Sequence, residues 1–291
     1  MLLTIFTPTY NRSKCLMRLY NSLCQQTDSR FEWVIVDDGS TDNTRSLVRQ
    51  WMDEAIVHIR YFYQKNSGKS MAHNQGVRLC KTEFFVCVDS DDWLTNNAVS
   101  VVLAAAEKLS PIHTGLLMPR RFIDEKSRFI QTLMPHVDSC TLYDAYEHYG
   151  MQGDTMLVFK TSILKQFEFP CFEGEKFIPE SYLYNLIDCV GPLKVLCTAV
   201  YNCEYQNDGY TNNVALLLKK NPRGYIVCVN QRLQLMDKTL WTKFRDSARY
   251  VSMMFVLNPR RILNDAVYPI FTILALPIGW WVYRKKYKII K

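Results

Sequence analysis

Short apolar runs alternate with amphipathic stretches over residues 2–92, and this alternation is the feature that most constrains the fold. The apolar runs predict strands at Leu2–Phe6, Trp33–Val36, Val57–Tyr63 and Phe84–Val88. The amphipathic stretches predict helices at Arg12–Gln25, Asn43–Met52 and Ser70–Cys80. Neighbouring parallel strands need a crossover connection, which such helices supply. The pattern therefore predicts an α/β fold with a mixed, mainly parallel sheet flanked by helices.

Polar residues follow each of the four predicted strands. These segments are Thr7–Asn11, Asp37–Ser40, Lys65–Lys69 and Asp89–Asp92. In open sheets of this kind, ligands bind beyond the carboxyl ends of the strands. We therefore expect the four loops to converge on one binding site, with Asn11 also placed to cap the helix after it.

The segment Asp89-Ser90-Asp91-Asp92, which we call the acidic turn, places three carboxylates directly after an apolar strand. A divalent cation would relieve their mutual repulsion, and Mg²⁺ or Mn²⁺ typically uses one or two carboxylates plus substrate phosphates. The alternative is a turn whose acids only complement the N-terminus of the next helix. The three companion loops favour a metal site with Asp91, Asp89 and Asp92 as candidate ligands. Within it, Asp91 is the expected metal ligand and Asp89 the expected ribose contact.

Asp38 is the candidate residue for base recognition. A carboxylate at a strand end can accept a hydrogen bond from the imino group of uracil or guanine. The segment Asp37–Ser40 is also typical of a turn before a helix capped by Ser40 or Thr41. The two interpretations are compatible.

Four motifs occur in order along the chain: TPTYNR, VDDGSTDNT, NSGKSMAHNQG and VDSDDW. Together they resemble the inverting family-2 glycosyltransferases, which have a Rossmann-like GT-A fold, and the resemblance covers residues 1 to 110. It implies a nucleotide-sugar donor, with a UDP-sugar expected, and a divalent cation, Mn²⁺ or Mg²⁺. It also implies donor-binding and catalytic positions in this sequence, namely Pro8, Tyr10, Asp38, Lys69, Asn74, Asp89 and Asp91.

The second half contains GEKFIPESYLYNLID and LALPIGWWVYRKK. These segments resemble members that build bacterial surface polysaccharides, capsule or O-antigen, on a lipid carrier. The resemblance implies a lipid-linked or oligosaccharide acceptor and an acceptor-side carboxylate as general base. Glu180 occupies the matching position, and its rivals are Glu173, Glu175 and Asp188. The Q-x-x-R-W signature of processive synthases is absent, which favours addition of a single sugar by inverting displacement.

The C-terminal region differs in kind from the rest of the chain. Residues 240–291 hold ten Lys or Arg against two Asp, a net of +8, whereas the whole chain carries +7. Residues 266–283 have no charge, and Pro269 and Pro277 are expected to interrupt them. We therefore predict a GT-A domain at 1–240, with a donor part at 1–110 and an acceptor-side lobe at 111–240, and a helical membrane-associating region at 241–291.

Basic residues flank the uncharged run on both sides, and such flanks prefer the cytoplasmic face of a membrane. We expect an interfacial or re-entrant segment that makes the protein peripheral or monotopic at the cytoplasmic face of the inner membrane. The alternative is a buried hairpin of helices. No signal peptide is expected at the N-terminus, which lacks a basic region and a long apolar run.

Several other classes of protein fit the sequence less well. The ten cysteines are scattered without a C-x-x-C pair, as expected for reduced thiols in a cytosolic compartment. No G-x-G-x-x-G follows the first strand, which disfavours a dinucleotide oxidoreductase, and no nucleic-acid partner is expected. A nucleotidyltransferase acting on a sugar phosphate remains an alternative, although TPTYNRSK lacks the glycines typical of that class. A non-catalytic, membrane-anchored sugar-nucleotide-binding scaffold is the second alternative.

Overall fold

A computed structural model describes residues 1–123, 129–204, 214–235 and 239–288. The chain is organised as two compact units. The first unit comprises Met1–Glu168 and Val190–Tyr205, and the second comprises Phe169–Cys189 and Gln206–Lys291. The division predicted at residue 240 stays a prediction.

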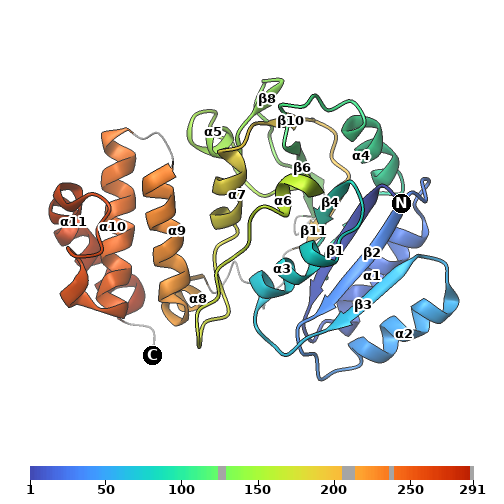
Figure 1. Cartoon of the computed structure of the whole chain (residues 1–291), viewed down its shortest axis with the longest axis horizontal. Coiled ribbons are helices and arrows are strands. Elements are labelled where there is room, and N and C mark those ends of the chain that lie inside the picture. The colour runs from blue at the N-terminus through green and yellow to red at the C-terminus, as the bar shows by residue number, and fades with distance from the viewer. Residues whose placement is uncertain (124–128, 205–213, 236–238, 289–291) are drawn as a thin grey trace. The chain divides into compact units, whose positions relative to one another are not determined.

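The N-terminal half of the first unit is a parallel sheet joined by helices, as predicted (Figure 1). Its strands are β1 (Leu3–Thr9), β2 (Phe31–Asp37), β3 (Ile59–Tyr63) and β4 (Phe84–Cys87). Its helices are α1 (Ser13–Cys24), α2 (Thr44–Glu54), α3 (Lys69–Leu79) and α4 (Ala98–Ala106). The parallel strands lie in the order β3-β2-β1-β4, so the segments after them are at one edge of the sheet.

Beyond β4 the sheet becomes mixed, which confirms the predicted fold class. Its further strands are β5 (Trp93–Leu94), β6 (Gly115–Ile123), β7 (Phe129–Gln131), β8 (Ser139–Cys140), β9 (Thr155–Lys160), β10 (Leu193–Val195) and β11 (Tyr201–Glu204). Strand β9 is antiparallel to both β4 and β6, while β11 runs parallel to β6 and antiparallel to β5. The pairing of β11 with β5 brings a late segment of the first unit beside the acidic turn. Two short helices, α5 (Leu142–Glu147) and α6 (Thr161–Leu164), complete this unit.

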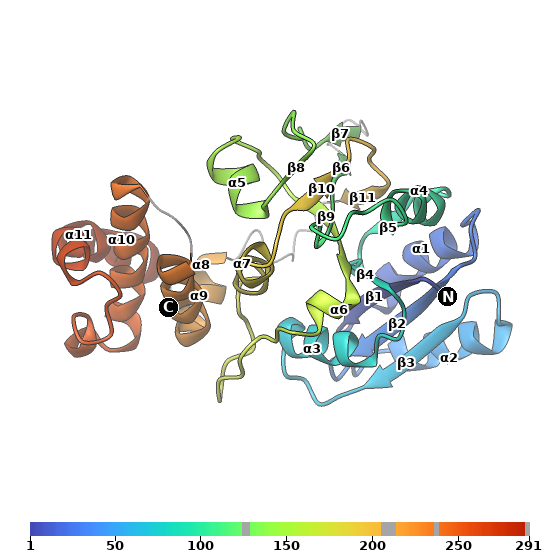
Figure 2. The ribbon, with the colours of Figure 1, turned by 45° about the horizontal axis from the view of Figure 1, so that its top comes forward.

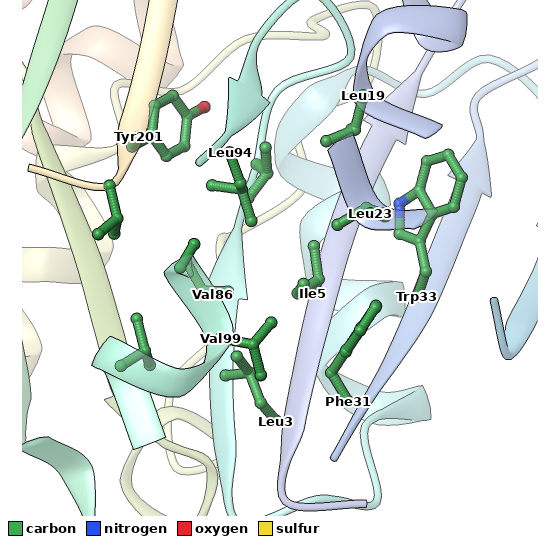
Figure 3. Packing of buried hydrophobic residues seen from close by; sticks show 14 of the residues in the cluster. Leu3, Ile5, Leu19, Leu23, Phe31, Trp33, Val86, Leu94, Val99 and Tyr201 are labelled. Atoms are coloured by element: carbon green, nitrogen blue, oxygen red, sulfur yellow. The ribbon is translucent and has the colours of Figure 1, made fainter. Parts of the chain in front are cut away.

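The core of the first unit lies on both faces of the sheet. On one face, Ile5 and Val86 point toward Leu19 and Leu23 of α1 and toward Val99 of α4 (Figure 3). On the other face, the ring of Phe6 packs against helix α3, which approaches so closely at Gly76 that a Cβ atom there would collide with that ring. Both faces of the parallel strands are therefore buried, which explains why the sequences of these strands are apolar runs.

The second unit is helical. Its elements are α7 (Ser181–Asp188), α8 (Val214–Lys220), α9 (Pro222–Leu235), α10 (Leu240–Leu257), η2 (Pro259–Arg261), α11 (Pro269–Val282) and the π-helical turn η3 (Tyr283–Tyr287). Helix α10 lies beside both α9 and α11 (Figure 2). Apolar side chains from these helices, including Val229, Leu233, Val251 and Met254, form its core.

Two prolines were predicted to interrupt the C-terminal run, and this was wrong for Pro277. Pro269 is the first residue of α11, where its missing N–H has no helical partner to lose, and Pro277 lies inside the same helix. Among the residues that the structure describes, no helix is long and apolar enough to cross a membrane.

Candidate active site

Strand β1 extends further than predicted, so Pro8 belongs to the strand and not to the loop after it. Pro8 is buried and pairs with Val36 of β2, and the pairing of β1 with β4 has already ended at Phe6. Tyr10 follows the strand with 48% of its surface exposed. Of the two predicted nucleotide contacts in this segment, Tyr10 has the accessible ring.

The prediction that Asn11 caps the first helix was wrong. Asn11 adopts a left-handed conformation, with φ of 52°, and its Oδ1 accepts a hydrogen bond from the N–H of Thr41 at 2.8 Å. Asp42 instead receives the N–H of Ser13 at the start of α1, at 3.1 Å, and that of Thr44 at the start of α2, at 3.0 Å. These bonds join the segments after β1 and β2.

Asp38 organises the segment after β3. Its buried carboxylate accepts three hydrogen bonds, from the side chain of Gln64 at 2.7 Å and from the backbone N–H groups of Ser67 at 2.8 Å and Gly68 at 2.7 Å. The contact of Asp38 with a nucleotide base stays a prediction. The structure adds that this carboxylate stabilises the conformation of the segment between β3 and α3.

Gly39 lets the segment after β2 lie close to the segment after β3. Its φ is +89°, and a Cβ atom at this position would lie 2.8 Å from the backbone nitrogen of Asn66. The carboxylate of neighbouring Asp37 also has protein partners, because it accepts hydrogen bonds from the N–H of Ser40 and the hydroxyl of Tyr61. The segments after β1, β2 and β3 therefore form one connected surface.

The acidic turn is held by residues distant in the sequence. The Tyr201 hydroxyl accepts a hydrogen bond from the N–H of Asp89 at 3.0 Å and donates one to Oδ2 of Asp92 at 2.7 Å. The guanidinium of Arg120 lies 4.1 Å from the centre of the Tyr201 ring, and its Nη1 is 3.9 Å from Asp89 and 3.7 Å from Asp92. Lys69, the first residue of α3, places its Nζ 2.7 Å from Oδ1 of Asp89.

Sequence reasoning identified Lys69 but missed Arg120 and Tyr201. Both lie in strands of the first unit, β6 and β11, and those strands are parallel neighbours that pair Tyr201 with Arg120. Only this pairing brings them together beside the acidic turn. No motif in the sequence singles out either residue.

The three carboxylates of the acidic turn have different electrostatic environments. Burial favours the protonated form of Asp89, but the charges of Lys69 and Arg120 outweigh it and lower its pKa. Burial and the charge of Asp89 raise the pKa of Asp91. Burial and the same neighbouring charge raise the pKa of Asp92 to about 7. Of the three carboxylates, Asp89 therefore favours the ionised form most strongly, and its charge disfavours ionisation of the other two.

Asp91 is the member of the turn best suited to accept a cation. Arg18 donates to its backbone carbonyl at 2.6 Å while the same guanidinium stacks on Trp93 and pairs with Glu204. The backbone of Asp91 is thus fixed, and at its carboxylate burial and the charge of Asp89 outweigh the nearby positive charges of Arg12 and Lys69. A cation here would remove the repulsion from Asp89.

These residues fit a metal bound by one protein carboxylate together with substrate phosphates, which is a common arrangement for Mg²⁺. They form no preassembled cage, because in the described part of the chain no three acidic, His or Cys side chains are gathered as metal ligands. Asp89 and Asp92 already have protein partners. The ligand set of Asp89, Asp91 and Asp92 therefore stays a prediction, with Asp91 as its central member.

Two further predicted donor residues lie on α3. Lys69 begins this helix, and Asn74 is buried one turn further along. The structure thus brings all the predicted donor-binding and metal-binding residues into the first unit. They come from the carboxyl ends of β1, β2 and β4 and from α3.

Glu180, the predicted general base, belongs to the second unit. It is exposed immediately before α7, and the hydroxyl of Tyr184 lies 3.5 Å from its Oε2. Its rival Glu175 has a structural role. The Glu175 carboxylate accepts hydrogen bonds from the backbone N–H groups of Arg223 and Gly224 at the start of α9, at 2.9 and 2.8 Å. This arrangement caps α9 and disfavours Glu175 as the base.

Two rivals of Glu180 remain. Glu173 is exposed, and Asp188 is the last residue of α7. The catalytic role of Glu180 stays a prediction.

Comparison with known proteins identifies the class. Residues 4–172 match the sequence profile of glycosyl transferase family 2, and this match spans more than half of the chain. The chain therefore belongs to glycosyl transferase family 2. Over 102 residues, 35% of its length, it is 38% identical to the chondroitin synthase of Escherichia coli. It spans 15% of the length of that relative.

Solved structures show the same fold at low sequence identity. S. aureus TarS 1–349 in complex with UDP superposes with a TM-score of 0.68 and 18% identity, covering 98% of this chain and 89% of TarS 1–349. The mannosyltransferase PcManGT from Pyrobaculum calidifontis, in complex with GDP-Man and Mn²⁺, has a TM-score of 0.57 and 16% identity. That match covers 98% of this chain and 88% of the mannosyltransferase.

Proposed function

We propose that this protein transfers a sugar from a nucleotide-sugar donor, most suitably a UDP-sugar, to a saccharide acceptor with inversion at the anomeric carbon. One observation carries the proposal. The acidic turn lies at the carboxyl end of β4, with Lys69, Arg120 and Tyr201 arranged around its carboxylates. Family membership and the UDP complex of TarS support the donor class.

The charges in the first unit suit a diphosphate. A bound divalent cation, held by Asp91, would neutralise the developing charge of the leaving nucleoside diphosphate. Lys69 lies at the N-terminus of α3, where the helix dipole adds a partial positive charge. Lys69 and Arg120 hold Asp89 ionised, so Asp89 acts as a hydrogen-bond acceptor for a ribose hydroxyl.

The displacement requires one proton transfer. The acceptor hydroxyl oxygen forms a bond to the anomeric carbon while the bond from that carbon to the donor diphosphate oxygen breaks. Glu180 takes the proton of the acceptor hydroxyl as general base. Its exposure is compatible with access by a large acceptor.

We further propose that the acceptor is a lipid-linked saccharide of a surface polysaccharide, at the cytoplasmic face of the membrane. The polysaccharide named by the chondroitin synthase match and the apolar, basic C-terminal region support this part. The family match disfavours the nucleotidyltransferase alternative. The scaffold alternative differs from the proposal in predicting no turnover.

Turnover of variants tests the proposed roles. We expect Asp91→Asn and Glu180→Gln each to lower sugar transfer about a hundred-fold or more, because they remove the metal ligand and the general base. Matched controls are Asp53→Asn and Asp265→Asn, which change exposed acids in the same two units. Release of nucleoside diphosphate in the presence of Mn²⁺, donor and acceptor measures the rate. Transfer by Glu180→Gln at the wild-type rate would show that another group is the base.

A further inference from the structure

Helix α11 of the second unit presents an apolar face to solvent. We call this face the α11 stripe, and it consists of Ile270, Ile273, Leu274, Pro277, Ile278 and Trp281. These positions recur at intervals of three and four residues, so they lie on one side of the helix. Ile270 is 73% exposed and Leu274 is 60% exposed. Such a contiguous exposed surface is typical of an interaction site.

The opposite side of α11 is fixed to its neighbour. Thr272, Ala275 and Gly279 are buried there, again at helical spacing. Helix α10 approaches so closely at Gly279 that a Cβ atom in this position would collide with the side chain of Val251. Because only the small residues fit against α10, α11 cannot rotate to bury the stripe.

Basic residues adjoin the stripe and provide the complement to an anionic partner. Arg284, Lys285 and Lys286 are exposed directly after α11, and residues 266–291 contain no acidic residue. The guanidinium of Arg284 lies 5.1 Å from the ring centre of Trp280, and the ammonium of Lys285 lies 6.0 Å from that of Trp281. Aromatic rings beside cations are typical of the headgroup region of a bilayer.

The length of α11 indicates how it would meet a bilayer. Its 14 residues extend over about 21 Å, whereas the hydrocarbon core is about 30 Å thick. A second copy of the chain is a less suitable partner, because its residues 266–291 hold no acidic side chain that could neutralise the basic cluster. We propose that the α11 stripe docks the protein on an anionic lipid surface, with the helix lying in the membrane plane.

This inference deepens the proposed location at a membrane surface, on which it rests, and it does not depend on the transfer reaction. Vesicle binding is measured without any nucleotide, so its failure would leave the proposed reaction untouched. Conversely, a protein without transferase activity could still bind vesicles through this surface. The two proposals can therefore fail separately.

Vesicle flotation of the full chain tests the proposal. The vesicles contain phosphatidylcholine alone or phosphatidylcholine mixed with phosphatidylglycerol. We expect binding to the mixed vesicles that resists high salt, because apolar insertion is not screened. The double variant Ile273→Ser, Leu274→Ser should bind about ten-fold more weakly or worse. Lys285→Glu with Lys286→Glu should abolish the preference for the anionic lipid.

Exposed apolar residues of the first unit supply a matched control. Ile56 and Ile112 are 64% and 66% exposed, and their double replacement by Ser should leave vesicle binding unchanged. All altered residues are exposed, so circular dichroism should show the wild-type helix content. The proposal is overturned if high salt releases the wild type, if the α11 double variant binds as tightly as the wild type, or if that variant instead dissociates a dimer.

Discussion

Tyr201 connects two carboxylates of the acidic turn through a single hydroxyl. It accepts the N–H of Asp89 and donates to Asp92, while its ring supports Arg120. Both bonds lie in a region where water cannot easily replace them, because Tyr201 and Asp92 are buried. The shape of the turn therefore depends on a residue of β11 that makes no proposed contact with the donor.

We predict that Tyr201→Phe lowers sugar transfer about ten-fold or more, as is usual for residues that orient metal ligands. The stability of the first unit should fall by about 1–3 kcal/mol, because Asp92 loses its donor and the Asp89 N–H its acceptor. Steady-state kinetics and chemical unfolding measure the two effects. Tyr63→Phe, at an exposed tyrosine, is the control. Unchanged kinetics in Tyr201→Phe would contradict a positioning role.

At the residue scale, sequence reasoning found the side chains directly after the strands and missed those that reach the site from elsewhere. Asp38, Lys69 and Asp89 occur in loops or at a helix start whose place at the sheet edge follows from the alternating pattern. Arg120 and Tyr201 reach the site through the pairing of β6 with β11. Such long-range pairings leave no local signal in a single sequence.

At the element scale, the parallel strands were predictable because their apolar runs are short and flanked by polar turns. Predicted helix starts were less accurate. Asn11 was expected to cap α1, but its side chain bonds to the segment after β2, and Asp42 serves both α1 and α2. A polar residue before a helix predicts a cap only when no neighbouring loop offers a competing partner.

His113, in the segment before β6, should make stability depend on pH. Burial and the charges of Lys194 and Lys160 lower its pKa. The unfolded chain therefore binds a proton more readily than the folded one, so stability is lost as the pH falls below about 6.5. His113→Asn, which can keep the bond to Ser110, should reduce this loss. Urea unfolding at neutral and mildly acidic pH measures it, and an identical pH dependence in the variant would refute the assignment.

At the scale of the whole molecule, the first unit contains the proposed donor site and the second contains Glu180 and α11. The units are interleaved in sequence, because residues 169–189 leave the first unit before β10 and β11 return to it. No break in composition marks these crossings, so the sequence did not indicate them. The basic composition after residue 239 predicts a distinct region there, and that division stays a prediction.

Asp246 stabilises the helical unit through charge. It is buried in α10, and its carboxylate lies 2.9 Å from Arg232, 2.9 Å from Arg249 and 3.5 Å from Arg245. We predict that Asp246→Asn destabilises this unit by about 3–5 kcal/mol, because the guanidinium groups lose their shared partner. Asp265→Asn, which breaks the exposed pair with Arg261, should cost less than about 1 kcal/mol. Hydrogen exchange of the backbone amides in α9 and α10 measures the loss of stability in each variant. Equal protection in the two variants would contradict the prediction.

Binding of nucleoside diphosphate at the acidic turn tests the central claim most directly. Isothermal titration of the wild-type chain with UDP and Mn²⁺ should show one site per chain. Chelation of the metal, or Asp91→Asn, should weaken that binding about ten-fold or more, equivalent to about 1.4 kcal/mol. Asp53→Asn should bind UDP as the wild type does. Absence of binding by both UDP and GDP, or undiminished binding by Asp91→Asn, would contradict the proposed site.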